Sequence, residues 1–583
     1  MGTHRSIKAV WLLCLLLAAC NGRTVIDEPK NESASQATPP EQLKGMDEEQ
    51  REFLWQIEHY GNILNQIAFP ALAGALKQAD DKAIAGMLVS DFEGGAPYQP
   101  KETSLHNEFL DVVRLTDAGH PPEKLDAAQF VERLLDFRRY FKHSVRGSKI
   151  ALMKLRPTKE DDLYAPWEGT GQLRITGERE AGKPAEVVVY LKYRTVRPTK
   201  EAIAKGKWLL ACSITQSQMG SAQHFLMREV AAERGLEPGM IYDNWKLNTI
   251  DPVTGGVYLC DFDRDGILDV LITDKTGYYL YKGLPNGKFK NVTREMGLPG
   301  IPREATSRGL MAAWVDLDGD GWEDLLLGPD IYKNENGKHF LNVTPLSNLR
   351  LPSNTGGIAV ADYDGDGKMD LYIFHSGVGK ADSWLEGKAG TGTGNQLWRN
   401  KGNWLFEEVT AKSGTGGEER STFTALWLDA NNDGKPDLYV PNEFGDGVLY
   451  VNQGNGTFKP TVLSKSACDF GTMGATAGDI DGSGNISIYC GNMYSKAGSR
   501  VIGNVRPGTY PAKIMEKMRT FVKGSELHVN RGGLKFDQKG QEWQVNDAGW
   551  SYGPALVDLN NDGFLDIHAT CGYISRNRNE PDG

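Results

Sequence analysis

Acidic side chains recur in short, closely spaced groups along the second half of the chain. The segment "DYDGDGKMD", which begins at Asp362, places four carboxylates within nine residues. Carboxylates this close repel one another, but oxygen ligands at positions 1, 3 and 5 converge on one cation when a Gly at position 6 allows a sharp turn. Calcium accepts many oxygen ligands in a flexible geometry, whereas magnesium demands a strict octahedron. We therefore expect bound Ca²⁺.

The pattern occurs five times, and a sixth copy has lost part of it. The other full copies read "DFDRDGILD", "DLDGDGWED", "DANNDGKPD" and "DLNNDGFLD". The sixth, "DIDGSGNIS", has Ser483 and Ser487 at positions 5 and 9, so we expect it to be weak or empty. The predicted ligands of about five calcium sites are Asp261, Asp263, Asp265, Asp269, Asp316, Asp318, Asp320, Asp324, Asp362, Asp364, Asp366, Asp370, Asp429, Asn431, Asp433, Asp437, Asp558, Asn560, Asp562 and Asp566. The weaker candidates are Asp479 and Asp481.

A loop rich in Asp and Gly can also form without a metal ion or belong to an EF-hand. A single copy can be a solvated turn whose side chains cap the backbone, but five copies in phase favour a metal site. An EF-hand requires a bidentate Glu at position 12 and a following helix. Position 12 is instead Ile272, Leu327, Ile373, Val440, Cys490 and Ala569. The EF-hand is therefore excluded.

The acidic loops belong to a longer repeat that begins near residue 223. A strand-and-turn piece recurs in phase as "LYKGLPNGKF", "IYKNENGKHF", "LWRNKGNWLF", "LYVNQGNGTF" and "LHVNRGGLKF". Small and apolar residues precede a loop, as in "GGIAVA", and a short strand such as "LYIF" follows it. Each unit thus has about four short strands, the size of a propeller blade. We predict a mainly β protein with a six- to seven-bladed β-propeller over residues 223–583.

Residues 46–222 have a different pattern and are expected to form a separate, small α+β domain. Helical periodicity runs through "EEQREFLWQIEHYGNILNQIAFPALAGALKQ" and "DAAQFVERLLDFRRYFKHS". Strand-like runs follow, namely "KIALMKL", "GQLRITGE", "AEVVVYLKYRTV" and "KWLLACSITQ". This order suggests helices packed on a curved antiparallel sheet, faintly similar to a nuclear-transport-factor-2-like cone.

The N-terminus has the features of a processing segment. Arg5 and Lys8 flank the start of an apolar run over residues 9–18, which is too short to span a bilayer. The run ends in "LAAC", which resembles a bacterial lipobox with Cys20 as the lipidated residue. We expect a signal peptide over residues 1–20, a flexible linker over residues 21–45, and anchoring to the membrane of the bacterial cell envelope through Cys20. The alternative is an ordinary secretory signal with a chance Cys.

Charge and cysteine content limit the classes of partner and cofactor. The formal net charge of −11 disfavours nucleic acid as a partner. Five cysteines remain beyond Cys20 and none has the CxxC spacing of a zinc site. One or two disulfides and buried free thiols are both compatible with this number.

The repeated loops resemble the FG-GAP/VCBS repeats, the calcium-loop repeats of integrin α-chain propellers. The segments "GNMYSKAGSRV" and "GYISRN", which follow the last two loops, resemble those of bacterial relatives of the cartilage acidic protein. The resemblance covers about residues 223–583 and implies a seven-bladed, calcium-stabilised propeller that binds partners. Only six loop units are present in this sequence, which leaves the blade number open.

The expected function is that of a binding scaffold whose partner is a protein or a glycan. The alternatives are a carbohydrate-active, lyase-like enzyme built on a calcium-rich propeller and a purely structural envelope or assembly protein. The sequence has no GxSxG, Walker or HExxH motif, so an enzyme has no support from a catalytic motif. A Gly-rich insertion over residues 384–398 is a candidate contact loop.

Overall fold

The computed structural model describes residues 47–142, 144–159, 162–225, 227–243, 255–302, 307–352, 355–375, 394–417, 420–443, 445–463, 471–494 and 496–571. The predicted signal peptide, the linker, Cys20 and most of the Gly-rich insertion lie outside these residues. They form two compact units: the N-terminal unit runs to Glu229 and also includes Lys496–Ala512, and the C-terminal unit contains Val230–Ser495 and Lys513–Gly583. The sequence predicts a boundary at residue 222 and one continuous C-terminal domain. The structure shows in addition that Lys496–Ala512, which lies in the C-terminal part of the sequence, belongs to the N-terminal unit.

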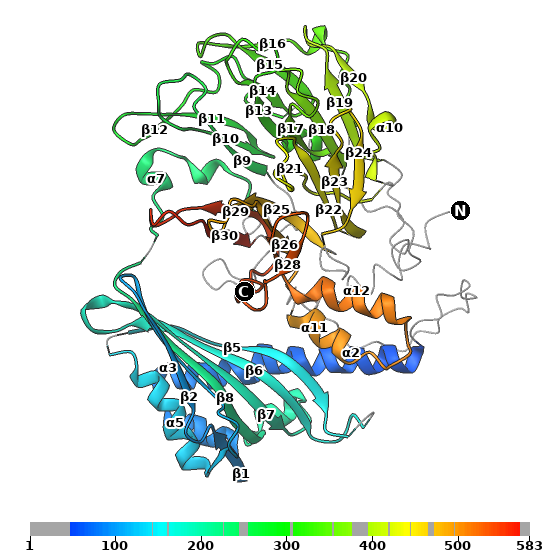
Figure 1. The fold of residues 1–583 in the computed structure, drawn as a ribbon. Coiled ribbons are helices and arrows are strands. Elements are labelled where there is room, and N and C mark those ends of the chain that lie inside the picture. The colour runs from blue at the N-terminus through cyan, green and yellow to red at the C-terminus, as the bar shows by residue number, and fades with distance from the viewer. Residues whose placement is uncertain are drawn as a thin grey trace, which may run out of the picture. The chain divides into compact units, whose positions relative to one another are not determined.

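Helices and one large sheet make up the N-terminal unit (Figure 1). Its helices are α2 (Glu48–Ile63), which continues through a π-helical turn into α3 (Phe69–Gln78), and α4 (Asp81–Met87), α5 (Ala127–Arg139), α6 (Lys200–Ala204) and α11 (Lys496–Gly503). Its strands are β1 (Leu88–Ala96), β2 (Lys101–His106), β3 (Leu110–Thr116), β4 (Glu123–Leu125), β5 (Ser144–Pro157), β6 (Trp167–Glu178), β7 (Pro184–Thr195) and β8 (Leu209–Ala222). Among the described residues, no helix is both long enough and apolar enough to cross a membrane.

The sheet of the N-terminal unit is mixed, where the sequence predicts an antiparallel one. Strands follow the order β2-β3-β8-β7-β6-β5, and β1 pairs in parallel with β8. The four strands β1 to β4 precede α5, and the sequence pattern does not predict them because their side chains lack a clear apolar alternation. All six residues of β2 are exposed. The helix ends, by contrast, follow local signals, since Asp126 and Gln129 form a capping box at the start of α5.

Five four-stranded antiparallel sheets form the C-terminal unit, and they succeed one another in chain order (Figure 1). The first is β9 (Gly255–Cys260), β10 (Asp269–Asp274), β11 (Gly277–Gly283) and β12 (Phe289–Asn291); the second is β13 (Ala312–Val315), β14 (Asp324–Leu327), β15 (Asp330–Asn334) and β16 (Phe340–Asn342); the third is β17 (Thr355–Ala361), β18 (Asp370–His375), β19 (Gln396–Asn400) and β20 (Phe406–Glu408). The fourth is β21 (Leu426–Leu428), β22 (Asp437–Asn442), β23 (Gly445–Asn452) and β24 (Phe458–Thr461); the fifth is β25 (Thr472–Gly478), β26 (Ser487–Asn492), β27 (Glu526–Asn530) and β28 (Phe536–Gln538).

A further pair of strands, β29 (Ser551–Val557) and β30 (Asp566–Cys571), forms a two-stranded sheet. Helices α9 (Ser307–Leu310) and α10 (Thr410–Ser413) lie between successive sheets, α7 (Ala231–Arg234) precedes the first sheet, and α12 (Ala512–Lys523) lies between β26 and β27 of the fifth. The described residues therefore define a β-propeller with five four-stranded blades. The expectation of six to seven blades is not confirmed. Strands β29 and β30 correspond to the first two strands of a further blade, but the described residues contain no third and fourth strand for it.

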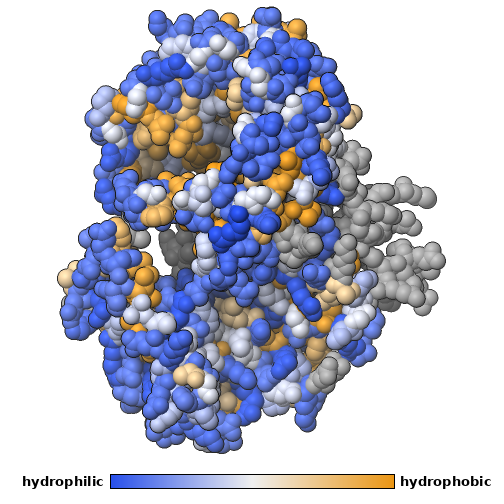
Figure 2. Space-filling view, in the orientation of Figure 1, coloured by the Kyte–Doolittle hydropathy of each residue, from blue (hydrophilic) through white to orange (hydrophobic). Residues whose placement is uncertain are grey.

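The core of the propeller lies between neighbouring blades. Leu271 and Leu280 of the first blade pack with Leu325 and Phe340 of the second, and similar clusters join each later pair of sheets. The innermost strands leave little room for side chains at some positions. A Cβ atom on Gly474 of β25 would lie 2.2 Å from the carbonyl oxygen of Tyr552 in β29. The visible surface is mostly hydrophilic, with hydrophobic residues in separate patches (Figure 2).

Candidate metal sites in the acidic loops

Each acidic segment is the tight loop between the first and second strands of a sheet, as predicted. The loop that begins at Asp261 joins β9 to β10, and the loop that begins at Asp558 joins β29 to β30. The Gly at position 6 has φ between 78° and 89° in all six loops. Residues with a Cβ atom rarely adopt this conformation, which explains why Gly is present even in the incomplete sixth copy, the degraded loop that begins at Asp479.

The carboxylate at position 1 organises the backbone of its own loop. It accepts a hydrogen bond from the N–H of position 6 at 2.7–2.9 Å in all six loops. In five of them it also accepts the N–H of position 5 at 3.0–3.1 Å. These bonds fix the same tight backbone turn in each loop.

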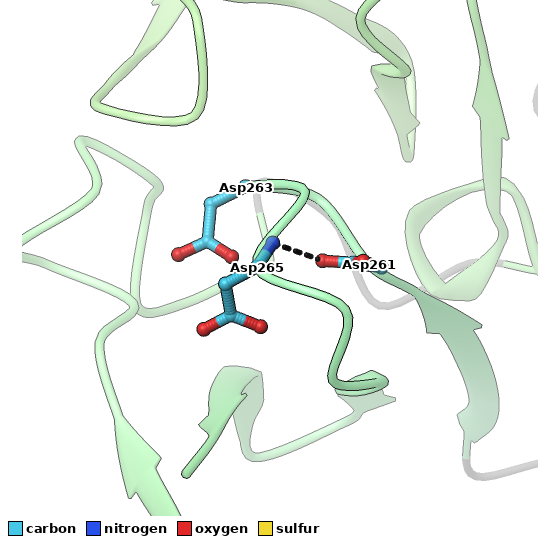
Figure 3. Close-up of side chains that lie close together, drawn as sticks. All are labelled: Asp261, Asp263 and Asp265. Carbon is cyan, nitrogen blue, oxygen red and sulfur yellow. Dashed lines mark hydrogen bonds between the residues drawn. The ribbon is translucent and has the colours of Figure 1, made fainter. Parts of the chain in front are cut away.

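Three loops bring their first three carboxylates together. In each, one oxygen of position 1, one of position 3 and one of position 5 all lie within 4.8 Å of one another. Figure 3 shows this arrangement for Asp261, Asp263 and Asp265, with the backbone N–H of Asp265 donating to Asp261. The other two groups are Asp316, Asp318 and Asp320 in the second blade and Asp362, Asp364 and Asp366 in the third. Clusters of this kind offer only oxygen, which suits a hard cation.

The remaining loops differ at positions 3 and 5. Asn431 and Asn560 replace Asp at position 3, and their amides donate to Asp433 at 3.3 Å and to Asp562 at 2.9 Å. The degraded loop retains Asp479 and Asp481, while Ser483 at position 5 donates its backbone N–H to Asp479 at 3.0 Å. These loops keep the same backbone turn with fewer carboxylates, and the expectation of about five calcium sites is not confirmed.

The Asp at position 9 has surroundings different from those of positions 1, 3 and 5. One oxygen accepts the backbone N–H of position 2 at 3.0–3.2 Å in all five full loops. In the first four blades, the other oxygen accepts a backbone N–H from the third strand at 2.7–2.9 Å. These four residues are Asp269, Asp324, Asp370 and Asp437, and all are buried. Position 9 thus ties the loop to its own sheet.

Burial raises the pKa of these position 9 carboxyls. It raises the pKa of Asp269 to about 6 and those of Asp324 and Asp370 to about 7, and the backbone hydrogen bonds act in the opposite direction. Other aspartates of the same loop add to the rise, since Asp265 and Asp261 both act on Asp269. A nearby divalent cation would favour the charged form of each carboxyl.

The residues present fit a calcium ion in one further respect. The Oδ1 atoms of Asp263 and Asp364 are buried, and neither has a hydrogen-bond partner among the described residues. Buried carboxylate oxygens without partners are uncommon because desolvation without compensation is costly. Both belong to position 3 of a three-carboxylate cluster, where a cation would supply the missing interaction.

Four buried Asn residues that the sequence pattern does not single out connect neighbouring blades. They are Asn334, Asn400, Asn452 and Asn530, each the last residue of the third strand. Each side-chain amide donates to the position 2 carbonyl of the preceding blade's loop at 2.8–2.9 Å. The same amide donates to the position 8 carbonyl of its own loop at 3.0–3.1 Å. The in-phase "N" of the strand-and-turn piece is the signal that could have identified them.

Cysteine side chains add no cross-link among the three cysteines whose state the structure describes. Cys212, Cys260 and Cys490 are free thiols, and Cys212 and Cys490 are buried. The alternative of buried free thiols is confirmed for Cys212 and Cys490, whereas Cys260 is a free thiol that is only partly buried. The sequence gives no support to a zinc site, and the clusters found among the described residues contain carboxylates alone.

The fold and the repeated loops together define a β-propeller with acidic loops of one type. A family model described as an FG-GAP-like repeat matches residues 261–327, 328–373 and 429–490. The chain therefore contains FG-GAP-like repeats, as the sequence resemblance predicts. The match over residues 328–373 contains the outer strands β15 and β16 of one blade and the inner strands β17 and β18 of the next. The sequence repeat is thus offset from the structural blade.

Solved structures that overlap with this chain do so weakly. One is an Agrocybe aegerita lectin described as recognising non-reducing terminal N-acetylglucosamine, with 13% identity and a TM-score of 0.32 over 76% of this chain and 90% of the lectin. Another is BBS1N in complex with ARL6DN, with 13% identity and a TM-score of 0.24 over 42% of this chain and 69% of that chain. No curated protein matches the chain.

Proposed function

We propose that the chain is an envelope-anchored recognition scaffold whose propeller is held rigid by calcium and binds a protein or glycan partner. FG-GAP repeats in a β-propeller fit a recognition scaffold. The observation that carries the calcium part is the recurrence of three converging carboxylates at the same place in three successive blades. The ring would have six or seven blades, with β29 and β30 as the first strands of the sixth.

Calcium would act by joining positions 1, 3 and 5 of a loop, because these positions carry like charges that repel one another when no cation is present. The loop in turn orients the position 2 carbonyl that accepts the Asn side chain of the next blade. A bound ion would therefore stiffen a loop and the contact between two blades. Loops at the rim of a rigid scaffold are where binding residues are usually placed.

The calcium proposal is tested by thermal unfolding of the purified mature protein. A ligand that binds only the folded state raises the melting temperature, so calcium chloride should raise it relative to EDTA, and magnesium chloride should raise it less. An unchanged melt in all three conditions would remove calcium from the proposal.

The partner is tested by binding to a glycan array and to proteins extracted from the cell envelope, each in calcium and in EDTA. A scaffold that depends on calcium should retain specific partners in calcium alone. A preference for acidic polysaccharides accompanied by their cleavage would instead support the lyase-like alternative.

Anchoring is tested on full-length protein expressed in cells that are given a labelled fatty acid. Wild-type protein should carry the label and sediment with membranes, because acyl chains attached at Cys20 would insert into the bilayer. The Cys20→Ser variant should lose the label and leave the membrane fraction. Membrane retention of that variant would contradict the lipid anchor.

A further inference from the structure

A basic side chain from the third strand reaches the acidic loop in each of the first three blades. These residues are Lys282 in β11, Lys333 in β15 and Arg399 in β19, each immediately before the last residue of its strand. Lys282 pairs with Asp263 and lies 3.0 Å from Asp265. Lys333 pairs with Asp318 and lies 2.6 Å from Asp320. The cations therefore meet positions 3 and 5, the same carboxylates that belong to the proposed metal cluster.

The third blade repeats this contact with a different basic residue. Nε of Arg399 lies 2.7 Å from Asp364, and Nη2 lies 3.0 Å from Asp366. The side chains of Lys282, Lys333 and Arg399 are between 27% and 31% exposed, so water screens their charges less than at a fully exposed pair. A Lys in two blades and an Arg in the third have head groups of different shape but the same positive charge, which indicates that charge is a property used at this position.

The fourth blade offers an internal comparison. Its equivalent residue, directly before Asn452, is Val451, which is buried and carries no charge. Asp433 pairs there with Lys435, which comes from the loop itself, at 3.0 Å. The fourth loop also has one carboxylate fewer, because Asn431 stands at position 3. Strand cations thus accompany the three loops with the highest density of carboxylates.

From this geometry, and resting on the proposed calcium function, we propose that Lys282, Lys333 and Arg399 are tethered counter-cations that compete with calcium for positions 3 and 5. Without calcium, the tethered cation offsets the repulsion among the carboxylates and keeps the blade folded. With calcium, the ion must draw the same oxygens away from it. The strand cation therefore lowers the calcium affinity of its loop and reduces the dependence of the blade on calcium.

The Lys282→Met variant tests this competition, because Met keeps much of the apolar stem and removes the charge. Calcium affinity is measured by titration calorimetry, and the melting temperature is measured in EDTA and in calcium. The variant should have a lower melting temperature than wild type in EDTA. It should bind calcium at least about threefold more tightly, as expected from losing one competing ion pair. Calcium should therefore raise its melting temperature by more than it raises that of wild type.

Two matched variants serve as controls. Lys290, the cross-strand partner of Lys282, pairs at 2.8 Å with Glu295 in a contact that is more than half exposed. Lys290→Met should behave as wild type in both measurements, and Lys282→Arg should do so because it keeps the charge. Arg399→Met provides the same test in a second blade if Lys282→Met does not fold.

The outcomes separate this inference from the calcium proposal. If wild type binds calcium and the calcium affinities of Lys282→Met and Arg399→Met are unchanged or weaker, the proposed competition between strand cation and calcium is wrong. The proposal of calcium sites is then retained. If neither wild type nor variant binds calcium, both ideas fail together. Tighter binding with a lower melting temperature in EDTA supports the tethered cation.

Discussion

The guanidinium of Arg500 and the carboxylate of Glu58, 442 positions apart in the chain, form a two-pronged ion pair inside the N-terminal unit. The two N···O distances are 2.8 Å and 2.6 Å. Only 3% of the Arg500 side chain and 11% of the Glu58 side chain is exposed. Arg500 belongs to "GNMYSKAGSRV", the insertion that follows the degraded loop. The ion pair is a contact that holds Lys496–Ala512 within the N-terminal unit.

Removal of the Arg500 side chain should therefore destabilise the N-terminal unit strongly. Arg500→Ala leaves a carboxylate buried without its partner, which typically costs about 3–5 kcal/mol of unfolding free energy. Arg506→Ala is the control, since Arg506 pairs with Glu49 at a more exposed site and should cost less than about 1 kcal/mol. Urea unfolding measures both. Equal losses would show that the Arg500 pair is not a main contact of the segment.

The buried Asn side chains that connect neighbouring blades predict a second large effect on stability. Asn400 is fully buried, and its amide joins the carbonyls of Leu317 and Met369. Asn400→Ala leaves both carbonyls without this donor, so we expect a loss of about 2–4 kcal/mol. Asn455 hydrogen-bonds within an exposed turn, and Asn455→Ala should cost less than about 1 kcal/mol. Chemical denaturation of the two variants, monitored by tryptophan fluorescence, distinguishes them. A loss of stability for Asn400→Ala as small as that for Asn455→Ala would refute the role of Asn400 in connecting the blades.

The loops should differ in how much they contribute to stabilisation by calcium. Asp366 belongs to a three-carboxylate cluster, whereas Ser483 occupies the same position in the degraded loop. Asp366→Ala should reduce the calcium-induced rise in melting temperature by about 2–4 °C, on the scale of 1 kcal/mol. Ser483→Ala should leave that rise unchanged. Differential scanning calorimetry in calcium and in EDTA provides the comparison, and equal effects would contradict the predicted ranking of the loops.

Glu443 predicts a dependence of stability on pH. Burial raises the pKa of Glu443 to about 8, and the hydroxyl of Ser421 opposes that rise. The folded-state pKa of Glu443 is above the unfolded value of 4.5, so the folded protein is favoured when this carboxyl is protonated. The contribution of the protonated Glu443 to folding stability is fully present below pH 4.5 and is lost as pH rises through 8. Glu443→Gln should remove this loss. Its melting temperature relative to wild type should be higher at pH 9 than at pH 5, and a constant difference would contradict the assignment.

The propeller could be predicted because its information is local and repeated. Asp, Gly and apolar residues recur in phase, so the loop, the strands beside it and the φ of the position 6 Gly follow from short segments such as residues 362–370. The role of Asp370 does not follow in the same way, because its partners include the backbone N–H of Asn400, 30 positions away. Strand β2 could not be predicted for the related reason that a strand exposed along its whole length lacks an apolar pattern.

The sequence alone determined that a repeated, oxygen-rich loop joins two short strands and that several such units make a propeller, because these features depend on neighbours a few residues apart. Only the tertiary structure decided what holds the units together. Asn334 reaches the carbonyl of Phe262 in the preceding blade, Lys282 reaches the acids of its own loop, and Arg500 pairs with Glu58. Such contacts join residues far apart in the chain, and their geometry arises only when the backbone has folded.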